Sequence, residues 1–235
     1  MKSLRRFVFQ MPGSSFPTLC ETDEGKACVI KMKGAGNGPR SLISEFVVNE
    51  TAGALGWPVP QVFPIIIPPN FPWSFGTDEF DDLVQKSYGV NLGFELIAEA
   101  KTLTLSETQK LSFELKSILI ALDLFFVNFD RTAKSQNVLQ DKEGKTWIID
   151  HGSCLALQTT RSFPFGLPPD HIFASYPREL APLIREKLQM LVEYADYVEI
   201  FEKIPMEWLT ESGLLLADLR KNWLWQRQEA DAFSL

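Results

Sequence analysis

Three side chains in the middle of this sequence have the types and the spacing needed to work on a phosphate. Asp130 is followed seven positions later by Asn137, and Asp150 comes directly after the apolar run 147–149. Phosphoryl transfer requires a protein mainly to position the nucleophile and to neutralise phosphate charge with Mg²⁺ and cationic groups. Mg²⁺ prefers oxygen ligands, which the Asp150 carboxylate and the Asn137 amide can supply. The spacing therefore predicts a site for magnesium and phosphate.

A hairpin would bring Asn137 and Asp150 side by side. Residues 138–139 and 147–149 are β-branched, aromatic or apolar, and a polar turn separates them, which is typical of two paired strands. A carboxylate at the end of such a strand is partly buried, and this is unfavourable unless it is paired or bound to a metal. The alternative is a solvated connection in which Asp130 and Asn137 serve only as turn and cap residues.

Upstream segments contain groups that a nucleotide requires. A strand at 7–10 leads into a loop at 11–17 that contains Gly13, Ser14 and Ser15. Backbone N–H and hydroxyl groups in such a loop can donate hydrogen bonds to phosphate oxygens. We therefore expect these three residues to contact the cofactor.

The next strand and helix supply a lysine and a glutamate. Apolar residues at 27–32 predict a strand that carries Lys31 near its end, and the apolar spacing over 41–56 predicts a helix. Glu45 and Glu50 lie on different faces of this helix, because five residues turn it by about 500°. Glu45 is favoured as the partner of Lys31, since the helix direction places it nearer the strand end. An ordinary exposed lysine is the alternative.

Taken in order, these segments resemble a HipA-like kinase domain. The resemblance is carried by Gly-Ser-Ser-x-Pro (13–17), Val-Ile-Lys (29–31), Ser-Glu-Phe-Val (44–47), Leu-Gly-Trp-Pro-Val-Pro (55–60), Asp-Arg-Thr (130–132) and Trp-Ile-Ile-Asp-His-Gly (147–152). It implies an α+β, two-lobed protein kinase-like fold with ATP between the lobes. The implied single domain, residues 1–235, divides into a small β-rich N-lobe (1–98) and a mainly helical C-lobe (99–235).

The resemblance also implies roles by position. Lys31 would contact the ATP phosphates, and Glu45 would orient Lys31. Asp130 would be the catalytic aspartate. Asn137 and Asp150 would bind Mg²⁺.

The hinge and the remaining elements are expected from local patterns. Residues 93–97 would form the strand and hinge between the lobes, and the resemblance to kinases implies that the backbone of Glu95 and Leu96 meets adenine there. Core packing is the alternative for the Phe94 and Leu96 side chains. The pattern 106–109 is typical of a capping box that opens a helix toward Asp130. The other expected elements are a strand and surface loop at 58–72, a short acidic helix or an excursion of the chain at 78–90, an aromatic loop at 161–176 that packs or binds a partner, and helices at 178–204 and 206–230.

Several residues near the site depart from the family pattern or have alternative roles. Relatives commonly have Asn five residues after the catalytic aspartate, as the protein kinase loop does, but Ser135 stands there. Either Asn137 takes over the metal or the site is weakened. His151 replaces the Phe of the kinase Asp-Phe-Gly motif, a change similar to what the HipA-like group carries. Arg131 and Lys134 are either cations that steady the γ-phosphate or solvated loop charges.

The composition is typical of a globular protein, with 235 residues of which 45% are hydrophobic and 23% charged. A net charge of −7 argues against broad electrostatic capture of nucleic acid or anionic membrane. Cys20, Cys28 and Cys154 show no metal-like pairing, and Cys20 and Cys28 would face each other across a hairpin. No export signal or membrane-spanning run is evident, so we expect a cytoplasmic protein with reduced thiols.

These observations lead to one main hypothesis and two alternatives. The main hypothesis is an ATP- and Mg²⁺-dependent kinase of the HipA-like type that phosphorylates a serine or threonine hydroxyl on a protein. Family analogy makes Ser14 and Ser15 candidates for self-modification. The alternatives are a catalytically silent nucleotide-binding interaction protein and a kinase with a small-molecule hydroxyl acceptor. A regulatory protein partner is compatible with each of them.

Overall fold

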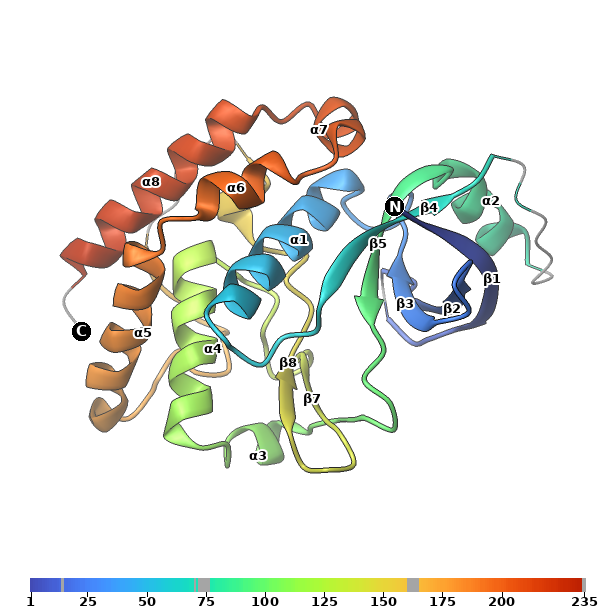
Figure 1. The fold of residues 1–235 in the computed structure, drawn as a ribbon. Helices are drawn as coiled ribbons and strands as arrows, with labels where there is room; N and C mark the ends of the chain where they lie inside the picture. Colours follow the sequence, from blue (N-terminus) through green and yellow to red (C-terminus); the bar gives the residue numbers. More distant parts are fainter. Residues whose placement is uncertain (14, 70, 72–76, 160–164, 234–235) are drawn as a thin grey trace.

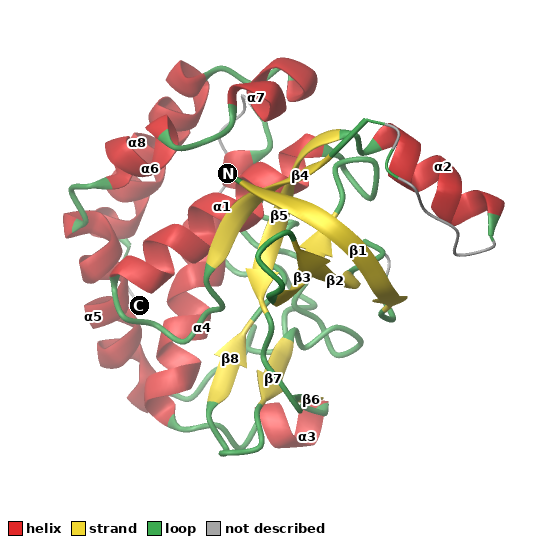
Figure 2. Ribbon diagram, turned by 45° about the vertical axis from the view of Figure 1, so that its right-hand side comes forward, coloured by secondary structure: helices red, strands yellow, loops and turns green. Residues whose placement is uncertain are grey.

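The computed structural model of the chain describes residues 1–13, 15–69, 71, 77–159 and 165–233. It is a mixed α+β structure with a β-rich N-terminal part and a helical C-terminal part, as the sequence predicted (Figure 1 and Figure 2). The strands are β1 (Lys2–Gln10), β2 (Thr18–Thr22), β3 (Ala27–Lys31), β4 (Val62–Ile67), β5 (Gly89–Glu95), β6 (Lys101–Thr102), β7 (Val138–Gln140) and β8 (Thr146–Ile148). The helices are α1 (Pro39–Ala54), α2 (Asp78–Lys86), α3 (Leu105–Thr108), α4 (Phe113–Phe126), α5 (Ala181–Glu193), α6 (Tyr197–Glu202), α7 (Met206–Ser212) and α8 (Leu216–Ala232).

Five strands close into a barrel in the order β1-β2-β3-β5-β4. The sequence predicted most of these strands but not the closure, which depends on a parallel pairing of β1 with β4 where Lys2 lies opposite Ile65. Apolar side chains fill the barrel, among them Ile65 and Phe80, the latter from α2. Cys20 and Cys28 face each other across β2 and β3, as predicted, with their Sγ atoms 3.2 Å apart.

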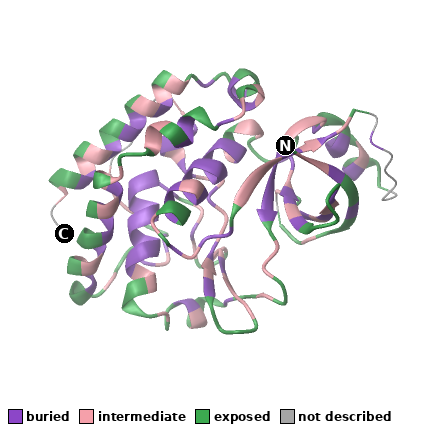
Figure 3. Cartoon of the chain, in the orientation of Figure 1, coloured by how far each residue is buried: buried purple, intermediate pink, exposed green. Residues whose placement is uncertain are grey.

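A second and larger core joins the C-terminal helices to α1. Helix α4 is buried along most of its length and lies at the centre of this part (Figure 3). Helix α1 contributes Phe46, Val47 and Val48 to the same core, although its sequence lies between two barrel strands. Hydrophobic packing thus crosses the predicted boundary between residues 98 and 99. The division of the chain into two lobes at that point stays a prediction. None of the helices in the described ranges combines the length and the apolar character needed to cross a membrane.

The helix predicted over 41–56 begins earlier than expected. It starts at Pro39 and ends at Ala54. Gly38 holds the N-cap position with a φ of 65° and no side-chain cap. Proline is favoured in the first turn of a helix, because its ring fixes φ and its missing N–H would have no helical partner there. The proline therefore replaces the capping side chain as the start signal.

The capping box predicted at 106–109 is shifted by two residues. Thr104 and Glu107 form the box, and it opens only the short helix α3. The long helix α4 has its own N-cap, Ser112, whose side chain accepts a hydrogen bond from the Leu115 N–H. The sequence contained two start signals, and only the second belongs to the helix that leads toward Asp130.

The two long C-terminal helices predicted from the sequence are each broken into two. The first expected span contains α5 and α6, and the second contains α7 and α8. The second break falls at Gly213, which has a left-handed φ of 69°, a conformation that glycine adopts without a steric penalty at helix ends. Each pair of shorter helices can therefore change direction and pack around α4 and α1.

Helix α7 ties the helical part to the barrel. Glu207 accepts hydrogen bonds from the Val90 backbone N–H at 2.9 Å and from Lys33 Nζ at 2.5 Å. Trp208 Nε1 donates to the Val90 carbonyl oxygen at 2.7 Å. Lys33, whose side chain is only 7% exposed, also pairs with Glu211. These contacts hold β5 and the chain after β3 against a helix that comes more than a hundred residues later.

Gly89 leaves the space that this contact needs. Its φ is +102°, and a methyl group there would lie 2.2 Å from Glu207 Oε1. We expect Gly89→Ala to displace Glu207 from Val90 and Lys33, and so to lower the free energy of unfolding by about 1–3 kcal/mol. Denaturant unfolding measures this change.

The matched control is Gly53→Ala in α1. A methyl group at Gly53 meets no atom within 4 Å, and alanine is favoured over glycine inside a helix. This variant should be neutral or slightly more stable than the parent protein. Equal destabilisation by both variants would contradict the packing role of Gly89.

Candidate active site

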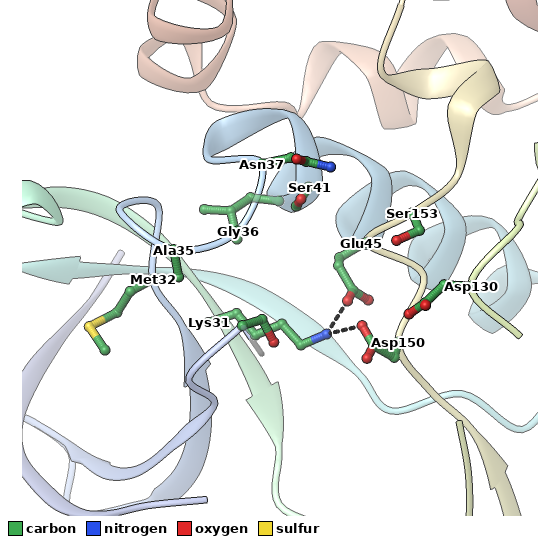
Figure 4. A pocket seen from close by; sticks show the side chains of 13 residues that line it. Lys31, Met32, Ala35, Gly36, Asn37, Ser41, Glu45, Asp130, Asp150 and Ser153 are labelled. Carbon is green, nitrogen blue, oxygen red and sulfur yellow. Dashed lines mark hydrogen bonds and ion pairs between the residues drawn. The ribbon is translucent and has the colours of Figure 1, made fainter. Parts of the chain in front are cut away.

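Lys31 connects strand β3 to helix α1 and to the chain after β8. Its ammonium pairs with Glu45 and lies 2.7 Å from Asp150 Oδ1 (Figure 4). The Glu45 side chain is fully buried, and its second oxygen accepts a hydrogen bond from the His151 backbone N–H at 3.0 Å. The Glu50 side chain is half buried and forms no hydrogen bond or ion pair with the side chain of Lys31 or Asp150; its nearest charge influence comes from Lys203. The structure thus groups Lys31 with Glu45 and Asp150 and leaves Glu50 outside.

The charges in this group depend on one another. Burial alone would lower the pKa of Lys31, but the neighbouring Asp150 and Glu45 carboxylates raise it overall. The Lys31 ammonium in turn holds the pKa of Asp150 well below its usual range. Burial raises the pKa of Glu45 to about 7. Asp150 therefore stays ionised at neutral pH and can meet a metal cation.

Asp130 lies beside this group, in the loop before β7. Burial raises the pKa of Asp130, and the Asp150 charge raises it further. A pKa shifted toward the working pH suits a group that must accept a proton during a reaction. The Asn137 amide lies close enough to the Asp130 carboxylate to favour its ionised form. Asn137 Nδ2 nevertheless makes no hydrogen bond of ordinary geometry with a described residue.

Asn137 and Asp150 lie at the open end of the predicted hairpin and share an unusual backbone conformation. Their φ angles are 54° and 61°, in the left-handed region that Asn and Asp enter more readily than other non-glycine residues. The Ile149 N–H donates to the Asn137 carbonyl oxygen at 3.0 Å, so the two residues lie side by side as predicted. Ser135 Oγ donates to Asn137 Oδ1 at 3.0 Å. The amide oxygen expected to bind Mg²⁺ therefore faces Ser135.

These residues fit a magnesium ion that is held partly by phosphate. Mg²⁺ in phosphate sites usually takes one or two carboxylates and completes its shell with phosphate oxygens and water. Asp150 and Asn137 supply such oxygens and line the same cavity. No group of three or more His, Cys, Asp or Glu side chains is arranged around a metal position in the described part of the chain. Phosphate and water would therefore have to supply most of the ligands.

Two cavities meet at this group of charges. The larger has a volume of 430 Å³ and extends toward the end of β5. The smaller has a volume of 240 Å³ and is bounded by the first turns of α1 and the loop before them (Figure 4). Ser15, Lys31, Asp130 and Asp150 line both cavities. These four residues thus stand where the two spaces join.

The larger cavity has the features of a nucleotide site. Its volume lies in the range of small-molecule sites, and much of its lining is apolar. Glu95 and Leu96 line it where β5 ends. The Glu95 N–H donates to the carbonyl oxygen of Gln61, just before β4, at 2.9 Å. Gly13 and Ser15 also line this cavity. Ser14 lies outside the described residues.

Arg131 is a buried structural residue, which corrects the prediction of a phosphate contact or a solvated charge. Its side chain is fully buried and its guanidinium pairs with Asp123 of α4. Nη1 donates to the carbonyl oxygens of Gln136 and Asn137, both at 2.9 Å. Lys134 is exposed. Arg131 therefore holds the loop that carries the candidate base and metal ligand.

Asp123 is the centre of this buried network. It accepts hydrogen bonds from Asn128 Nδ2 at 2.8 Å and His171 Nε2 at 3.0 Å in addition to those from Arg131. Asn128 Oδ1 in turn accepts from the Asp130 N–H at 3.2 Å. Burial opposes ionisation of Asp123, but Arg131 and His171 hold its pKa well below the usual range. Sequence reasoning missed the network, and the available signal was a carboxylate inside an apolar helix, which needs a partner.

His151, in the place of the kinase phenylalanine, behaves as an uncharged core residue. Burial lowers its pKa to about 3. Neither ring nitrogen has a hydrogen-bond partner among the described residues. Its backbone N–H, and not its ring, contacts Glu45. The ring therefore fills space next to the site without adding charge to it.

The described part of the aromatic loop predicted at 161–176 is packed. Phe173 is buried in the larger core, and Phe165 lies against Phe233 with ring centroids 4.9 Å apart. Residues 161–164 lie outside the described residues. The packing alternative thus accounts for these two aromatic side chains.

Comparisons with known proteins identify the family and a shared fold. The sequence model of the HipA-like kinase family matches residues 6–229. The crystal structure of the Helicobacter pylori proinflammatory kinase CtkA shares the fold, with a TM-score of 0.57 and 12% sequence identity over 96% of this chain and 93% of that chain. No curated protein matches the sequence. Since the family match spans nearly the whole chain, the protein belongs to the HipA-like kinase family.

Proposed function

We propose that this protein is an ATP- and Mg²⁺-dependent kinase that transfers the γ-phosphoryl group to a serine or threonine hydroxyl of a protein. The observation that carries the proposal is the position of Lys31, which bridges Glu45 and Asp150 beside Asp130 where two cavities meet. A strand lysine paired with a helix glutamate, next to a base and a metal-binding aspartate, is the protein kinase arrangement. The family match and the shared fold support this proposal.

Each residue of the site has a distinct task under this proposal. Bound MgATP would supply the phosphoryl group and the divalent charge that neutralises it. Lys31 positions phosphate oxygens, and the buried Glu45 restricts where its ammonium can lie. Asn137 and Asp150 would hold the metal ion. Asp130 would accept the proton of the acceptor hydroxyl while the bond from that oxygen to the γ-phosphorus forms and the bond from the γ-phosphorus to the β–γ bridging oxygen breaks, with ADP as the leaving group.

Incubation of the purified chain with γ-labelled ATP and a serine-containing peptide tests the proposal. We expect label on the peptide or on the protein itself, and consumption of ATP, only when Mg²⁺ is present. EDTA should stop both. Nucleotide binding with neither transfer nor ATP consumption in Mg²⁺ would contradict the proposed activity.

Asp150→Asn should remove the Mg²⁺ dependence of nucleotide binding. Even a hydrogen-bond partner of a metal ligand contributes about 10- to 100-fold to metal affinity, so loss of a ligand should lower the affinity for MgATP at least that much. Calorimetric titration with ATP in Mg²⁺ and in EDTA measures the effect. The parent protein should bind more tightly in Mg²⁺, and the variant should bind equally in both. A retained preference for Mg²⁺ would show that Asp150 is not a metal ligand.

A catalytically silent nucleotide-binding protein is the second candidate, and Ser135 favours it. The hydroxyl of Ser135 is bonded to Asn137 Oδ1, and it stands where relatives commonly have asparagine. If this exchange weakens the metal site, Ser135→Asn should raise both Mg²⁺ affinity and ATP turnover, by about tenfold or more. Side-by-side Mg²⁺ titrations of turnover in the two proteins measure this. Unchanged or lower turnover in the variant would mean that Asn137 serves the metal without help.

We further propose that the protein acts in the cytoplasm and binds neither nucleic acid nor membrane directly. The net charge of −7 supports the exclusion of nucleic acid and anionic membrane, because it disfavours both polyanionic partners. A regulatory protein partner is compatible with the proposal.

A further inference from the structure

His171 joins the segment that follows β8 to the loop that carries Asp130. Its Nε2 atom lies 3.0 Å from Asp123 Oδ2, and its side chain is fully buried. Among the described residues, the other side-chain donors to the Asp123 carboxylate are Asn128 and Arg131. Both of these lie within two residues of the candidate base in the sequence. His171 is therefore the member of this group that comes from a separate part of the chain.

The backbone around His171 is bonded to the same loop. Residues 132 and 171 form an antiparallel bridge, and the Ile172 N–H donates to the Arg131 carbonyl oxygen at 3.1 Å. Gln109 Nε2 donates to the Ile172 carbonyl oxygen at 2.8 Å, and Phe173 is buried in the larger core. These contacts do not involve the imidazole, so they should hold the segment in place when the His171 side chain is changed.

The hydrogen bonds of the imidazole fix which nitrogen carries the proton. The Phe173 backbone N–H donates to His171 Nδ1 at 3.1 Å, so Nδ1 must hold a lone pair. An ionised carboxylate can only accept hydrogen bonds, and Asp123 is kept ionised by its partners. Nε2 must therefore carry the proton that lies between His171 and Asp123. The two ring nitrogens thus have different partners and different roles.

Asp123 links His171 to the backbone of the loop. Asn128 donates to Asp123 at 2.8 Å and accepts the Asp130 N–H at 3.2 Å. Three consecutive hydrogen bonds thus join the imidazole to the backbone of the candidate base. Arg131, which pairs with Asp123, donates in turn to two carbonyl oxygens just before β7. A shift of Asp123 would therefore move both ends of the loop.

We propose that His171 is a positioning residue for phosphoryl transfer, whose Nε2–H bond to Asp123 sets where Asp130 stands relative to the acceptor hydroxyl. This inference rests on the proposed kinase activity and on Asp130 as its base. Neither His171 nor Asp123 lines either of the two cavities in the described structure. Loss of their bond should therefore slow transfer and leave nucleotide affinity unchanged, since a misplacement of about 1 Å can lower a rate about 10²-fold.

Two amide substitutions separate the roles of the ring nitrogens. The glutamine amide nitrogen can take the place of Nε2 and donate to Asp123, whereas the shorter asparagine can replace only Nδ1, as the acceptor for the Phe173 N–H. We expect His171→Asn to lower kcat for transfer to a serine peptide at least about tenfold, with the affinity for a non-hydrolysable ATP analogue unchanged. His171→Gln should restore kcat to within about threefold of the parent value.

A matched control loosens the segment without touching the imidazole. Gln109 is exposed, and its side chain holds the Ile172 carbonyl oxygen. Gln109→Ala removes this bond and leaves the one between His171 and Asp123 in place. It should transfer phosphate at close to the parent rate. A Gln109→Ala variant as slow as His171→Asn would mean that anchoring of the segment, and not the Nε2–H bond, determines the rate.

Nitrogen-15 NMR of the imidazole rings tests the bond in the parent protein without turnover. The chain has two histidines, His151 and His171, and the signals that disappear in His171→Gln belong to His171. We expect the tautomer with the proton on Nε2, and slow exchange of that proton with solvent. A proton on Nδ1, or a ring whose protons exchange freely, would overturn the inference even if no variant were active.

Amide hydrogen exchange over residues 128–137 measures the position of the loop in the same variants. Exchange should be faster in His171→Asn than in the parent protein, and it should return toward the parent rate in His171→Gln. Unchanged exchange in His171→Asn would overturn the link between His171 and the loop, whether or not the protein is a kinase.

The outcomes separate this inference from the kinase proposal. Absence of Asp130-dependent turnover in the parent protein overturns the kinase activity, and the role of His171 in transfer with it. Asp130-dependent turnover with equal rates in His171→Asn and His171→Gln, both full or both reduced, overturns the inference alone. Equal losses of rate and nucleotide affinity in His171→Asn do the same. If His171→Asn does not fold, His171→Gln decides, because a glutamine variant slowed at least about tenfold contradicts the role of the Nε2–H donor.

Discussion

Replacing Asp130 by asparagine should lower the rate of phosphoryl transfer by about 10²–10⁴-fold, the usual contribution of a general base, while nucleotide affinity stays nearly unchanged. Asparagine preserves the size of the side chain but cannot accept the hydroxyl proton. The groups proposed to hold the nucleotide, Lys31 and Asp150, remain paired with each other. Initial rates with γ-labelled ATP and a calorimetric titration of nucleotide binding measure the two quantities separately.

The stability of this variant separates a chemical role from a structural one. Burial and the nearby Asp150 charge both raise the pKa of Asp130, so removal of its negative charge should leave the melting temperature unchanged or raise it. Asp170→Asn, at an exposed position, is the control for the loss of one carboxylate. Full turnover in Asp130→Asn would exclude Asp130 as the base. Loss of folding would show that the loop requires this carboxylate.

The parts of the site that the sequence predicted depend on short-range patterns. The hairpin β7–β8 is local, and its pairing alone places Asn137 beside Asp150. Lys31 and Glu45 are fourteen residues apart on a strand and the helix that follows it. In both cases the residues between the two partners carry periodic apolar patterns that predict the connection.

The closure of the barrel and the attachment of α7 have no comparable local signal. Strand β1 pairs in parallel with β4 about sixty residues later, and no turn sequence joins them. Glu207 reaches Val90 and Lys33 across an even longer separation. The choice between packing arrangements of this kind depends on how whole elements fit together, which periodicity along one element cannot encode.

The buried network around Asp123 shows a different limit of sequence reasoning. Asp123 interrupts an apolar run, and Arg131 follows the candidate base directly. Each residue taken alone resembles a surface charge or a ligand contact. Only the fold reveals that their side chains meet in the interior. There the two buried charges pair with each other, and Arg131 also donates to the carbonyl oxygens of Gln136 and Asn137.

Asp123→Asn should be strongly destabilising, because it leaves the fully buried guanidinium of Arg131 without a counter-charge. Removal of one partner from a buried ion pair lowers stability by about 3–5 kcal/mol, which corresponds to a fall in melting temperature of about 6–20 °C for a chain of this size. Asn128 and His171 would lose a charged acceptor as well. Urea unfolding followed by tryptophan fluorescence measures the change.

The matched control breaks an exposed pair of the same chemistry. Glu202 pairs with Arg220 at 3.3 Å, and both side chains are well exposed, so Glu202→Gln should change stability by less than about 1 kcal/mol.

The pKa of Asp123 is held below its unfolded value of about 3.9. Its stabilising effect is therefore present above about pH 4 and is lost as the pH falls further, so the two proteins should become more alike in acid. A loss below about 1 kcal/mol in Asp123→Asn at neutral pH would mean that the carbonyl groups alone satisfy Arg131 and that the loop between Asp130 and Asn137 keeps its shape without the ion pair.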